Sequence, residues 1–383
     1  MMSVKHPDTI PHTAQNAASY AQDEMIMAHA CTLAQQGWGR TGDRPSVGCI
    51  IVRKGQIIAR ARTADGGQPH AEVAALAQAG NAAGTDVYVT LEPCAHHGRT
   101  PPCVDALIHA KPARVIIGLI DPDPRTAGQS IEKLKNAGIE TLVGCGGAKA
   151  RRTHNDHIRR IQDARPHITI KIATSLDGQI ATKDGHSRWI TGKPARDAGH
   201  RLRAQHDGIL VGSDTLLADN PRLSCRLAGI RHTLRSFVLD RRGRLRKTTT
   251  PLKAHDLQVL TDINHLPQKT PDNTAMRFHG MNLAQGPHRD RQDLITAMAL
   301  IAKLGISRLL IEGGGQIIAQ ALKAGIVDDL VWFRSAAIIG GDGIPAVAAM
   351  DLKALHDTPG LRRETITPIG EDVMEVFTCL PAS

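Results

Sequence analysis

The sequence predicts an α/β protein of two domains, and three observations support this. The chain has 383 residues, which is more than one ordinary hydrophobic core accommodates and enough for two domains. Strand-like and helix-like segments alternate as far as Cys145, as in a layered α/β domain. The composition then changes between Gly144 and Pro166, and a second α/β alternation follows. We expect a disordered tail over residues 1–20, a first domain over 21–147, a linker helix over 148–165 and a second domain over 166–383.

Composition and charge narrow the classes of protein and partner. Apolar residues make up 41% and charged residues 22% of the chain, as in globular proteins. No apolar run approaches the roughly 18 residues of a membrane span, and the N-terminus lacks a secretory signal, so we expect a cytoplasmic protein without a membrane partner. The net charge of +10 fits either nucleic acid or phosphorylated metabolites as partners. We favour metabolites, because there is no long Lys/Arg block and few aromatic residues are available for base stacking.

The elements of the first domain follow from apolar spacing. Residues 23–36 place Met27, Cys31 and Ala34 at helical intervals, which predicts a helix. The apolar runs 47–52 and 57–58 flank a Lys-Gly turn, which predicts a β-hairpin. Further along, the pattern predicts helices over 70–79, 102–110 and 131–137 and strands over 86–91 and 115–119.

The second domain repeats this alternation after the linker. Isoleucines at alternate positions over 167–174 predict its first strand, and the glycines 313–315 separate a strand over 308–312 from a helix over 316–324. The other expected elements are a helix over 194–204 and strands over 208–212, 236–239, 330–333 and 373–379. Residues 244–291 are polar and rich in turn-forming residues, and they receive no assignment.

One imidazole and two thiols form the strongest chemical signal in the sequence. His70-Ala71-Glu72 at an expected helix start is followed by Pro93-Cys94 and Pro102-Cys103. His70, Cys94 and Cys103 suit Zn²⁺ and leave a fourth position for water, whose pKa zinc lowers toward about 7. Glu72 is then placed to move protons, as in zinc-dependent deamination of a heterocycle. The alternatives are a structural zinc and cysteines that serve as small buried hydrophobes.

The remaining cysteine pattern refines this interpretation. Seven cysteines are an odd number, which argues against a disulfide framework. Eight residues separate Cys94 from Cys103, and they include His96, His97 and Arg99. Such a loop beside a metal favours an anionic substrate, although the two histidines are equally compatible with a solvated loop.

These motifs resemble those of the bifunctional deaminase/reductase family of riboflavin biosynthesis. The resemblance rests on Pro69–Glu72, on the segment 91–103 (Leu-Glu-Pro-Cys-Ala-His-His-Gly-Arg-Thr-Pro-Pro-Cys) and on Asp121-Pro122-Asp123-Pro124. It implies a cytidine-deaminase-like three-layer α/β/α domain in which His70, Cys94 and Cys103 hold zinc and Glu72 shuttles protons. The implied reaction removes the 2-amino group of 2,5-diamino-6-ribosylamino-4(3H)-pyrimidinone 5′-phosphate as ammonia.

Three positions depart from the family pattern. Arg44 stands where the family usually has an asparagine that helps to hold the pyrimidine, so that contact is lost or replaced. Ser130 stands where the family often has glycine. Arg241 follows Asp240 at a position where the family often has serine. Because the zinc residues are intact, we expect deamination to survive these changes.

The second half of the chain carries three clusters with chemical potential, which are Lys171–Gly178, Val211–Arg226 and Ile311–Gly315. A glycine run between strand and helix lets backbone N–H groups approach phosphate, although it is at least as often plain loop geometry. The clusters resemble the reductase domain of the same family, which implies a dihydrofolate-reductase-like α/β fold that uses NADPH to reduce a ring-opened ribosylamino group to ribitylamino. The implied NADPH contacts are Ala173, Trp189, Thr215, Asp219, Gly314, Gly315, Gln316, Ile317, Ile318, Ala319 and Gln320. The implied substrate contacts are Ser187, Arg203, Leu223, Arg226 and Glu312.

Plainer roles stay open for several of these residues. Trp189 also suits a core or interface position, Glu312 a helix cap and Asp219 a turn. Arg203 and Arg226 suit a 5′-phosphate, because a guanidinium binds phosphate through two hydrogen bonds, but they also suit the surface. Asp219 and Glu312 are the candidate proton donors for the reduction.

A tRNA-editing deaminase with a basic docking module is the main rival hypothesis. The long spacing between the two cysteines and the order of the second-half clusters favour the small-molecule enzyme. We therefore expect one Zn²⁺ per chain, NADPH, a phosphorylated pyrimidine substrate and no nucleic acid, and we leave homo-oligomer formation open.

Overall fold

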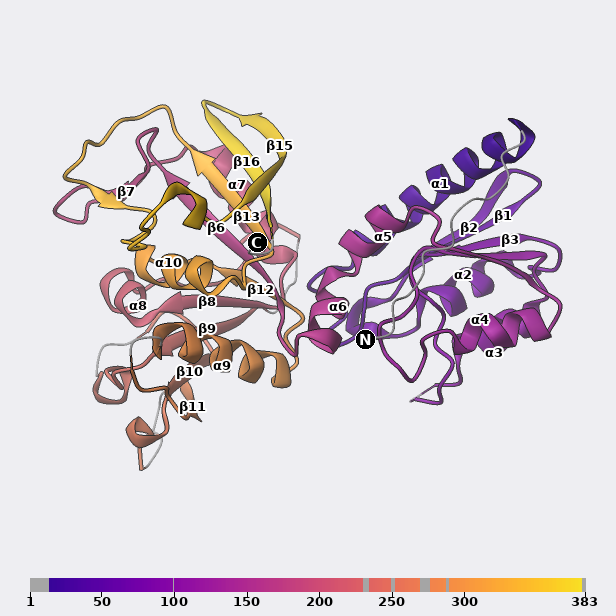
Figure 1. The fold of residues 1–383 in the computed structure, drawn as a ribbon, viewed down its shortest axis with the longest axis horizontal. Coiled ribbons are helices and arrows are strands. Elements are labelled where there is room, and N and C mark those ends of the chain that lie inside the picture. Colours follow the sequence, from indigo (N-terminus) through magenta and orange to yellow (C-terminus); the bar gives the residue numbers. More distant parts are fainter. Residues whose placement is uncertain are drawn as a thin grey trace. The chain divides into compact units, whose positions relative to one another are not determined.

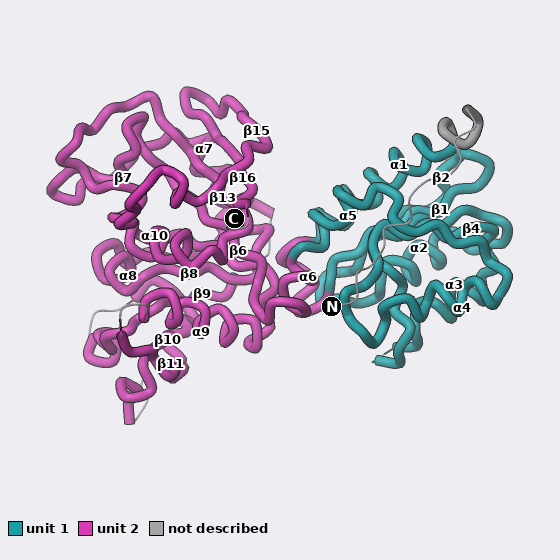
Figure 2. Tube along the Cα trace, viewed as in Figure 1, with its two compact units in different colours: residues 1–37, 45–155 teal, residues 38–44, 156–383 magenta. Residues whose placement is uncertain are grey.

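The computed structural model describes residues 14–98, 100–229, 234–248, 252–268, 276–286 and 289–380. The chain divides into two compact units (Figures 1 and 2). Unit 1 comprises residues 1–37 and 45–155, and unit 2 comprises residues 38–44 and 156–383. None of the described helices combines the length and the apolar character that crossing a membrane requires.

A five-stranded sheet forms the middle layer of unit 1. Its strands β1 and β2 pair as an antiparallel hairpin, and β3, β4 and β5 run parallel to one another. Parallel neighbours need helical crossovers, which α3 and α4 provide. In sheet order the strands are β2 (Gln56–Arg62), β1 (Gly48–Arg53), β3 (Asp86–Val89), β4 (Arg114–Ile117) and β5 (Glu140–Val143).

Helices cover both faces of this sheet, because its strands are apolar on both faces. In β1, Cys49 and Ile51 point into one core, whereas Ile50 and Val52 point into the other. The first core is covered by α2, α3 and α4, and the second by α1 and α5, as Figure 1 shows. These helices are α1 (Ala14–Gln35), α2 (Ala71–Ala79), α3 (Cys103–Ala110), α4 (Gln129–Asn136) and α5 (Gly147–Thr153). Unit 1 therefore has three layers in the order α/β/α.

The first helix is longer than the sequence predicted. A disordered tail was expected to residue 20 and a helix from Asp23, whereas α1 begins at Ala14. Residues 1–13 of that tail lie outside the described residues. Residues 14–21 are rich in alanine, which favours helix by intrinsic propensity, but they lack the apolar stripe that would have revealed it.

The linker is two helices where the sequence predicted one over residues 148–165. The helix α5 ends at Thr153, and α6 (Asn155–Gln162) begins after His154. His154 is buried, and its Nε2 lies 2.9 Å from Thr90 Oγ1. The contact between this ring and the first unit's sheet coincides with the interruption of the helix.

Unit 2 is built on a nine-stranded sheet in the order β11-β10-β9-β8-β12-β6-β13-β16-β15. The first seven strands of this order run parallel, and the last two are antiparallel to their neighbours. The parallel strands are β6 (His167–Thr174), β8 (Gly208–Gly212), β9 (Arg235–Asp240), β10 (Leu257–Asp262), β11 (Met276–Met281), β12 (Arg308–Ile311) and β13 (Asp329–Arg334). The antiparallel ones are β15 (Leu361–Ile369) and β16 (Asp372–Cys379), and a separate small sheet pairs β7 (Gln179–Ala181) with β14 (Ile344–Pro345).

Four helices cover the two faces of this sheet. The cluster under α9 (Arg289–Lys303) and α10 (Gly315–Ala324) includes Leu294 and Ile318. On the opposite face, α8 (Ser213–Asp219) and α7 (Lys193–Ala204) pack through Leu216 and Ala198. The region 244–291, unassigned from sequence, contains β10, β11 and the start of α9.

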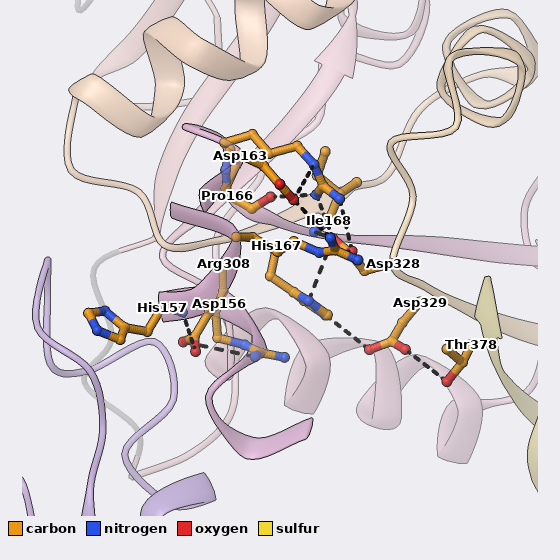
Figure 3. A network of polar contacts seen from close by, with 12 residues as sticks. Asp156, His157, Asp163, Pro166, His167, Ile168, Arg308, Asp328, Asp329 and Thr378 are labelled. Carbon is orange, nitrogen blue, oxygen red and sulfur yellow. Dashed lines mark hydrogen bonds and ion pairs between the residues drawn. The ribbon is translucent and has the colours of Figure 1, made fainter. Parts of the chain in front are cut away.

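A buried carboxylate joins α6 and β6 to the start of β13 (Figure 3). Asp328 accepts hydrogen bonds from Arg159 Nε at 2.8 Å, from Arg165 Nη1 at 2.7 Å and from the Ile168 backbone N–H at 2.9 Å. Burial alone would raise the pKa of Asp328, but His167 and the two arginines outweigh it and lower this pKa to about 2. The carboxylate is therefore an ionised, fully paired anchor.

Candidate metal centre and candidate substrate cleft

Three elements of unit 1 bring the predicted metal ligands together. His70 is the N-cap of α2, Cys94 lies in the loop after β3, and Cys103 is the first residue of α3. His70 Nδ1 is 3.2 Å from Cys103 Sγ and 3.7 Å from Cys94 Sγ, and all three ligand atoms lie within 4.8 Å of one another. Tetrahedral zinc, with bonds of about 2.0 to 2.3 Å, requires ligand separations of this order. The donor set and its geometry fit Zn²⁺.

The surroundings of Cys94 favour its thiolate form. A hydrogen bond with the Cys103 side chain lowers the pKa of Cys94, whereas burial raises it. The His70 ring also lowers this pKa, as does the Cys103 backbone N–H, which lies 3.2 Å from Cys94 Sγ. Together they lower the pKa of Cys94 below its usual value. A thiolate is the form that binds metal, so this cysteine is prepared for a cation.

Glu72 lies in the first turn of α2, two residues after His70, and is buried. Burial, reinforced by the negative charge of Cys94, raises the pKa of Glu72 to about 7. A carboxyl group with this pKa takes up and releases a proton near neutral pH, as a proton shuttle requires.

The two histidines in the loop between Cys94 and Cys103 differ in exposure. His96 is half-buried, and one of its ring nitrogens lies 3.2 Å from Thr126 Oγ1. His97 is exposed, and Arg99 lies outside the described residues. Of the two histidines, only His96 has the surroundings of a structured site residue.

The three departures from the family pattern have different surroundings. Arg44 Nε lies 3.9 Å from the Asp43 carboxylate. The Ser130 hydroxyl donates to the buried carboxylate of Glu92. Arg241 binds Asp290 and the buried Asp293 of α9, so this arginine joins β9 to α9.

Unit 2 contains a cleft that combines basic and apolar walls. Five of the residues predicted for the reductase site line it, and they come from β6, α7, β12 and the loops around them. These five are Ala173, Trp189, Arg203, Arg226 and Glu312. Trp189 is not a core aromatic, because it is 69% exposed and its ring stacks 4.3 Å from the Arg196 guanidinium.

Glu312 and Arg203 form a bidentate ion pair in the wall of this cleft. Burial alone would raise the pKa of Glu312, but Arg203 outweighs it and lowers this pKa to about 2. A third nitrogen of Arg203, Nη1, donates to the Ser224 carbonyl oxygen at 2.9 Å. The guanidinium of Arg203 is thus hydrogen-bonded to other protein groups, whereas the side chain of Arg226 is exposed at the cleft.

The remaining predicted residues lie at other positions of unit 2. Thr215 accepts a hydrogen bond from the Gly314 N–H at 3.0 Å, which joins α8 to the glycine turn before α10. A Cβ on Gly315 would lie 2.9 Å from the Pro345 carbonyl oxygen, so this position requires glycine. Asp219 is exposed at the end of α8, and Leu223 is buried in the core. The others are Ser187, which is half-buried, and Gln316–Gln320 in the first turns of α10, of which Ile317, Ile318 and Ala319 are buried.

Two further cleft residues, Lys171 and His200, received no site role from the sequence, although Lys171 begins the first of the three second-half clusters. Lys171 interrupts the buried strand β6, and burial lowers the pKa of its ammonium group. Its position between Ile170 and Ile172 was the available signal, because a lysine in a buried strand is costly without a role. His200 lies one helical turn before Arg203 on α7, and burial lowers its pKa as well.

Two family models match the chain and together cover both units. The cytidine and deoxycytidylate deaminase zinc-binding region matches residues 20–119, and the RibD C-terminal domain matches residues 166–374. The riboflavin biosynthesis protein RibD of Escherichia coli (strain K12) is 35% identical over 366 residues, covering 92% of this chain and 98% of its own length. RibD of Aquifex aeolicus is 34% identical over 361 residues, covering 93% and 98%.

Solved structures agree with these matches. Form 1 of Acinetobacter baumannii RibD has a TM-score of 0.82 at 31% identity and covers 94% of this chain and 99% of its own. A Thermotoga maritima structure, named as a diaminohydroxyphosphoribosylaminopyrimidine deaminase/5-amino-6-(5-phosphoribosylamino)uracil reductase, has a TM-score of 0.82 at 29% identity and covers 94% and 100%. The predicted pairing of a deaminase-like domain with a reductase domain is confirmed.

Proposed function

The chain belongs to the RibD family and is a bifunctional deaminase and reductase of riboflavin biosynthesis, and from this premise we propose how its residues divide the two reactions. Residues 21–147 deaminate the 2-amino group of 2,5-diamino-6-ribosylamino-4(3H)-pyrimidinone 5′-phosphate. Residues 166–383 then reduce the ribosylamino group of the product to ribitylamino. The observation that carries the proposal is the set of His70, Cys94 and Cys103 ligand atoms within 4.8 Å of one another, beside the buried Glu72.

In the deaminase, His70, Cys94 and Cys103 would hold Zn²⁺, which would supply a water of lowered pKa as the nucleophile. The Glu72 carboxylate takes up the proton that the reaction releases and delivers it to the leaving amino group. The ring carbon gains an oxygen, the carbon–nitrogen bond breaks, and ammonia departs. The burial of Glu72 supports this role, because it keeps bulk water from competing for the proton.

In the reductase, the cleft holds the ring-opened substrate, and the cofactor residues named below would hold NADPH, which would supply the hydride for the imine carbon. The protein supplies the proton for the imine nitrogen, so that the C=N bond becomes an amine. Arg226 contacts the 5′-phosphate, and Arg203 orients Glu312. Trp189, Thr215, Asp219 and the segment Gly314–Gln320 contact the cofactor, with Ala173 at the cleft wall.

Lys171 is the proton donor that we assign to this reduction. Glu312 is ionised at neutral pH, since its pKa is lowered to about 2, and it therefore holds no proton to donate. Asp219 is exposed at the end of α8, so we do not assign the proton transfer to it. Lys171 lines the cleft, and its lowered pKa makes it a better acid than an ordinary lysine.

We propose NADPH as the reductant in preference to NADH. The segment 241–247 after β9 carries five basic side chains, Arg241, Arg242, Arg244, Arg246 and Lys247. Arg244 contacts Ser213 at the start of α8, the helix that also carries Thr215. Arg241 pairs with Asp290 and Asp293, and Arg244 pairs with Asp214. The positive charge of the other three residues favours the cofactor with the additional phosphate.

A single preparation tests the function. The zinc content is measured first, then ammonia release from the diaminopyrimidine substrate, then NADPH oxidation with the deaminated intermediate, with NADH as the comparison. Absence of zinc together with absence of ammonia release would overturn the deaminase assignment. We also propose a cytoplasmic enzyme that binds no nucleic acid, and tRNA-binding measurements check the second point.

A further inference from the structure

We propose that Glu92 is a positioning residue of the deaminase, which holds the turn 121–128 against the loop that carries Cys94. This inference rests on the deaminase function proposed above. Glu92 is two residues before Cys94, so its backbone leads directly into a metal ligand. Its side chain is not part of the metal set, and the residue is only 2% exposed. A buried carboxylate at this place requires partners, and they show what it does.

The recorded hydrogen bonds of the Glu92 carboxylate all come from one segment. Oε2 accepts the backbone N–H groups of Asp121 at 3.3 Å and Gly128 at 3.0 Å. Oε1 accepts the Ser130 N–H at 3.3 Å and the Ser130 hydroxyl at 2.9 Å. A carboxylate has about four acceptor positions, so these donors satisfy it. If the turn moved, its buried N–H groups and the Glu92 carboxylate would lose their hydrogen bonds, which costs free energy. Glu92 therefore fixes the position of the turn backbone.

Two further contacts join the same segment to the residues just after Cys94. A ring nitrogen of His96 lies 3.2 Å from Thr126 Oγ1, and Lys133 Nζ donates to the Ala95 carbonyl oxygen at 3.2 Å. Residues on both sides of Cys94 therefore bind the segment 121–133. The turn and the metal-ligand loop form one connected structure, and Glu92 makes the most buried of its contacts.

Ser130 takes part in the same set of hydrogen bonds, which gives a structural role to the serine at a position where the family often has glycine. A glycine at this position would supply the backbone N–H but not the hydroxyl. Ser130 is fully buried, and its hydroxyl makes the shortest of the four contacts with Glu92. In this chain Glu92 and Ser130 therefore act as a pair.

The turn lies against the loop that carries Cys94, and we infer that it forms one wall of the deaminase substrate site. Its residues Asp121 and Asp123 are buried, and its Thr126 contacts His96, two residues from Cys94. A displaced wall weakens the hold on the pyrimidine but leaves the zinc ligands and Glu72 in place. Loss of Glu92 should therefore raise the KM of deamination more than it lowers kcat.

The test is Glu92→Gln, measured with zinc content and both activities on the full-length protein. We expect an increase of about tenfold in the deaminase KM, a smaller change in kcat, bound zinc retained at the wild-type ratio, and unchanged reduction of the deaminated intermediate. The matched control is Asp23→Asn, which alters another buried carboxylate of unit 1 that binds Tyr88 and Arg114. Loss of zinc, a fall in kcat at unchanged KM, or the same KM shift in the Asp23 variant would overturn the positioning role.

A second pair of variants keeps the inference testable if Glu92→Gln folds poorly. Ser130→Ala removes only the hydroxyl and should raise the deaminase KM about twofold to fivefold. The double variant should be no worse than Glu92→Gln alone, because both changes act through one contact. Strictly additive effects, or no effect of Ser130→Ala, would contradict the pair. Wild-type protein that releases no ammonia would instead contradict the proposed function and leave these contacts unexplained.

Discussion

Arg203 and Glu312 meet edge to edge in the wall of the unit 2 cleft, with Nε 2.8 Å from Oε1 and Nη2 2.9 Å from Oε2. Their side chains are only 14% and 12% exposed. A bidentate pair of this kind restricts the orientation of both groups. It holds the Glu312 carboxylate as the negative charge that offsets Arg203 and Lys171.

Glu312→Gln should lower the reductase kcat/KM by about 100-fold, because the released Arg203 and Lys171 lose their common negative neighbour and shift within the cleft. Deamination should be unaffected. Ammonia release and NADPH oxidation on one preparation check this, and a parallel fall of both rates would point to misfolding. Since the Glu312 pKa of about 2 lies far below neutral, Glu312 should contribute no pH dependence to the wild-type rate above about pH 4.

Arg226→Ala should raise the reductase KM about tenfold and lower kcat less. Its guanidinium is exposed at the cleft, and the phosphate contact that we propose for it would be equal in the ground state and the transition state. Arg222→Ala, an exposed arginine nearby that does not line the cleft, is the matched control. Steady-state kinetics on the deaminated intermediate measure both. An unchanged KM in the Arg226 variant would remove this residue from the phosphate site.

Lys171→Gln should lower the reductase kcat by about 100-fold to 1000-fold and abolish the loss of rate at alkaline pH. Burial lowers the pKa of the wild-type ammonium group, so its protonated, proton-donating form is lost at a lower pH than for a free lysine. The wild-type kcat should therefore fall on the alkaline side, below the ordinary lysine range. A variant with the same alkaline limb as the wild type would exclude Lys171 as the acid.

The chemistry of the metal centre was predictable because its signal is local. His70 and Glu72 are two residues apart, and each cysteine follows a proline, so residue types and spacing alone suggested zinc. Glu92 offered no such signal. Its partners are 29 to 38 residues away in sequence, and only the fold brings them to its carboxylate.

The fold was predictable where a buried strand carries apolar residues in an unbroken run, as β8 does, or at alternate positions, as β6 does. The strand β11 was missed, because its middle residues are only partly buried and include Arg277 and His279. Parallel pairing with β10 stabilises it despite that polar pattern. Arg203 shows that a partner distant in sequence could not be predicted at the site either. The sequence indicated that its guanidinium binds phosphate, but this group binds the carboxylate of Glu312, which is 109 residues away.

His70→Ala and Cys94→Ser should each abolish deamination and leave NADPH oxidation of the deaminated intermediate largely intact. Each variant removes one of the three metal ligands, and a site with two ligands binds zinc weakly. Elemental analysis should show the loss of zinc. If both activities fell together in a folded variant, independent sites would be the wrong description.

Asp328→Asn should destabilise unit 2 by about 3 to 5 kcal/mol at neutral pH, because Arg159 and Arg165 would lose their buried counter-charge. The pH dependence follows from the folded-state pKa of about 2, which lies below the unfolded value near 3.9. A carboxyl group with a depressed folded pKa stabilises fully above the unfolded value, and this stability is lost as the pH falls toward 2. Wild-type unit 2 should therefore lose roughly 2 kcal/mol between about pH 4 and pH 2 that the variant does not lose.

Tryptophan fluorescence during urea unfolding can report this for unit 2 alone, because the three tryptophans, Trp38, Trp189 and Trp332, all belong to it. Asp163→Asn is the matched control, since Asp163 also binds Arg159, at 2.8 Å, but its side chain is 37% exposed. A pair this exposed contributes less than about 1 kcal/mol. An Asp328 variant that loses stability in acid as steeply as the wild type would show that another group carries the acid sensitivity, since the carboxylate of Asp328 is then absent.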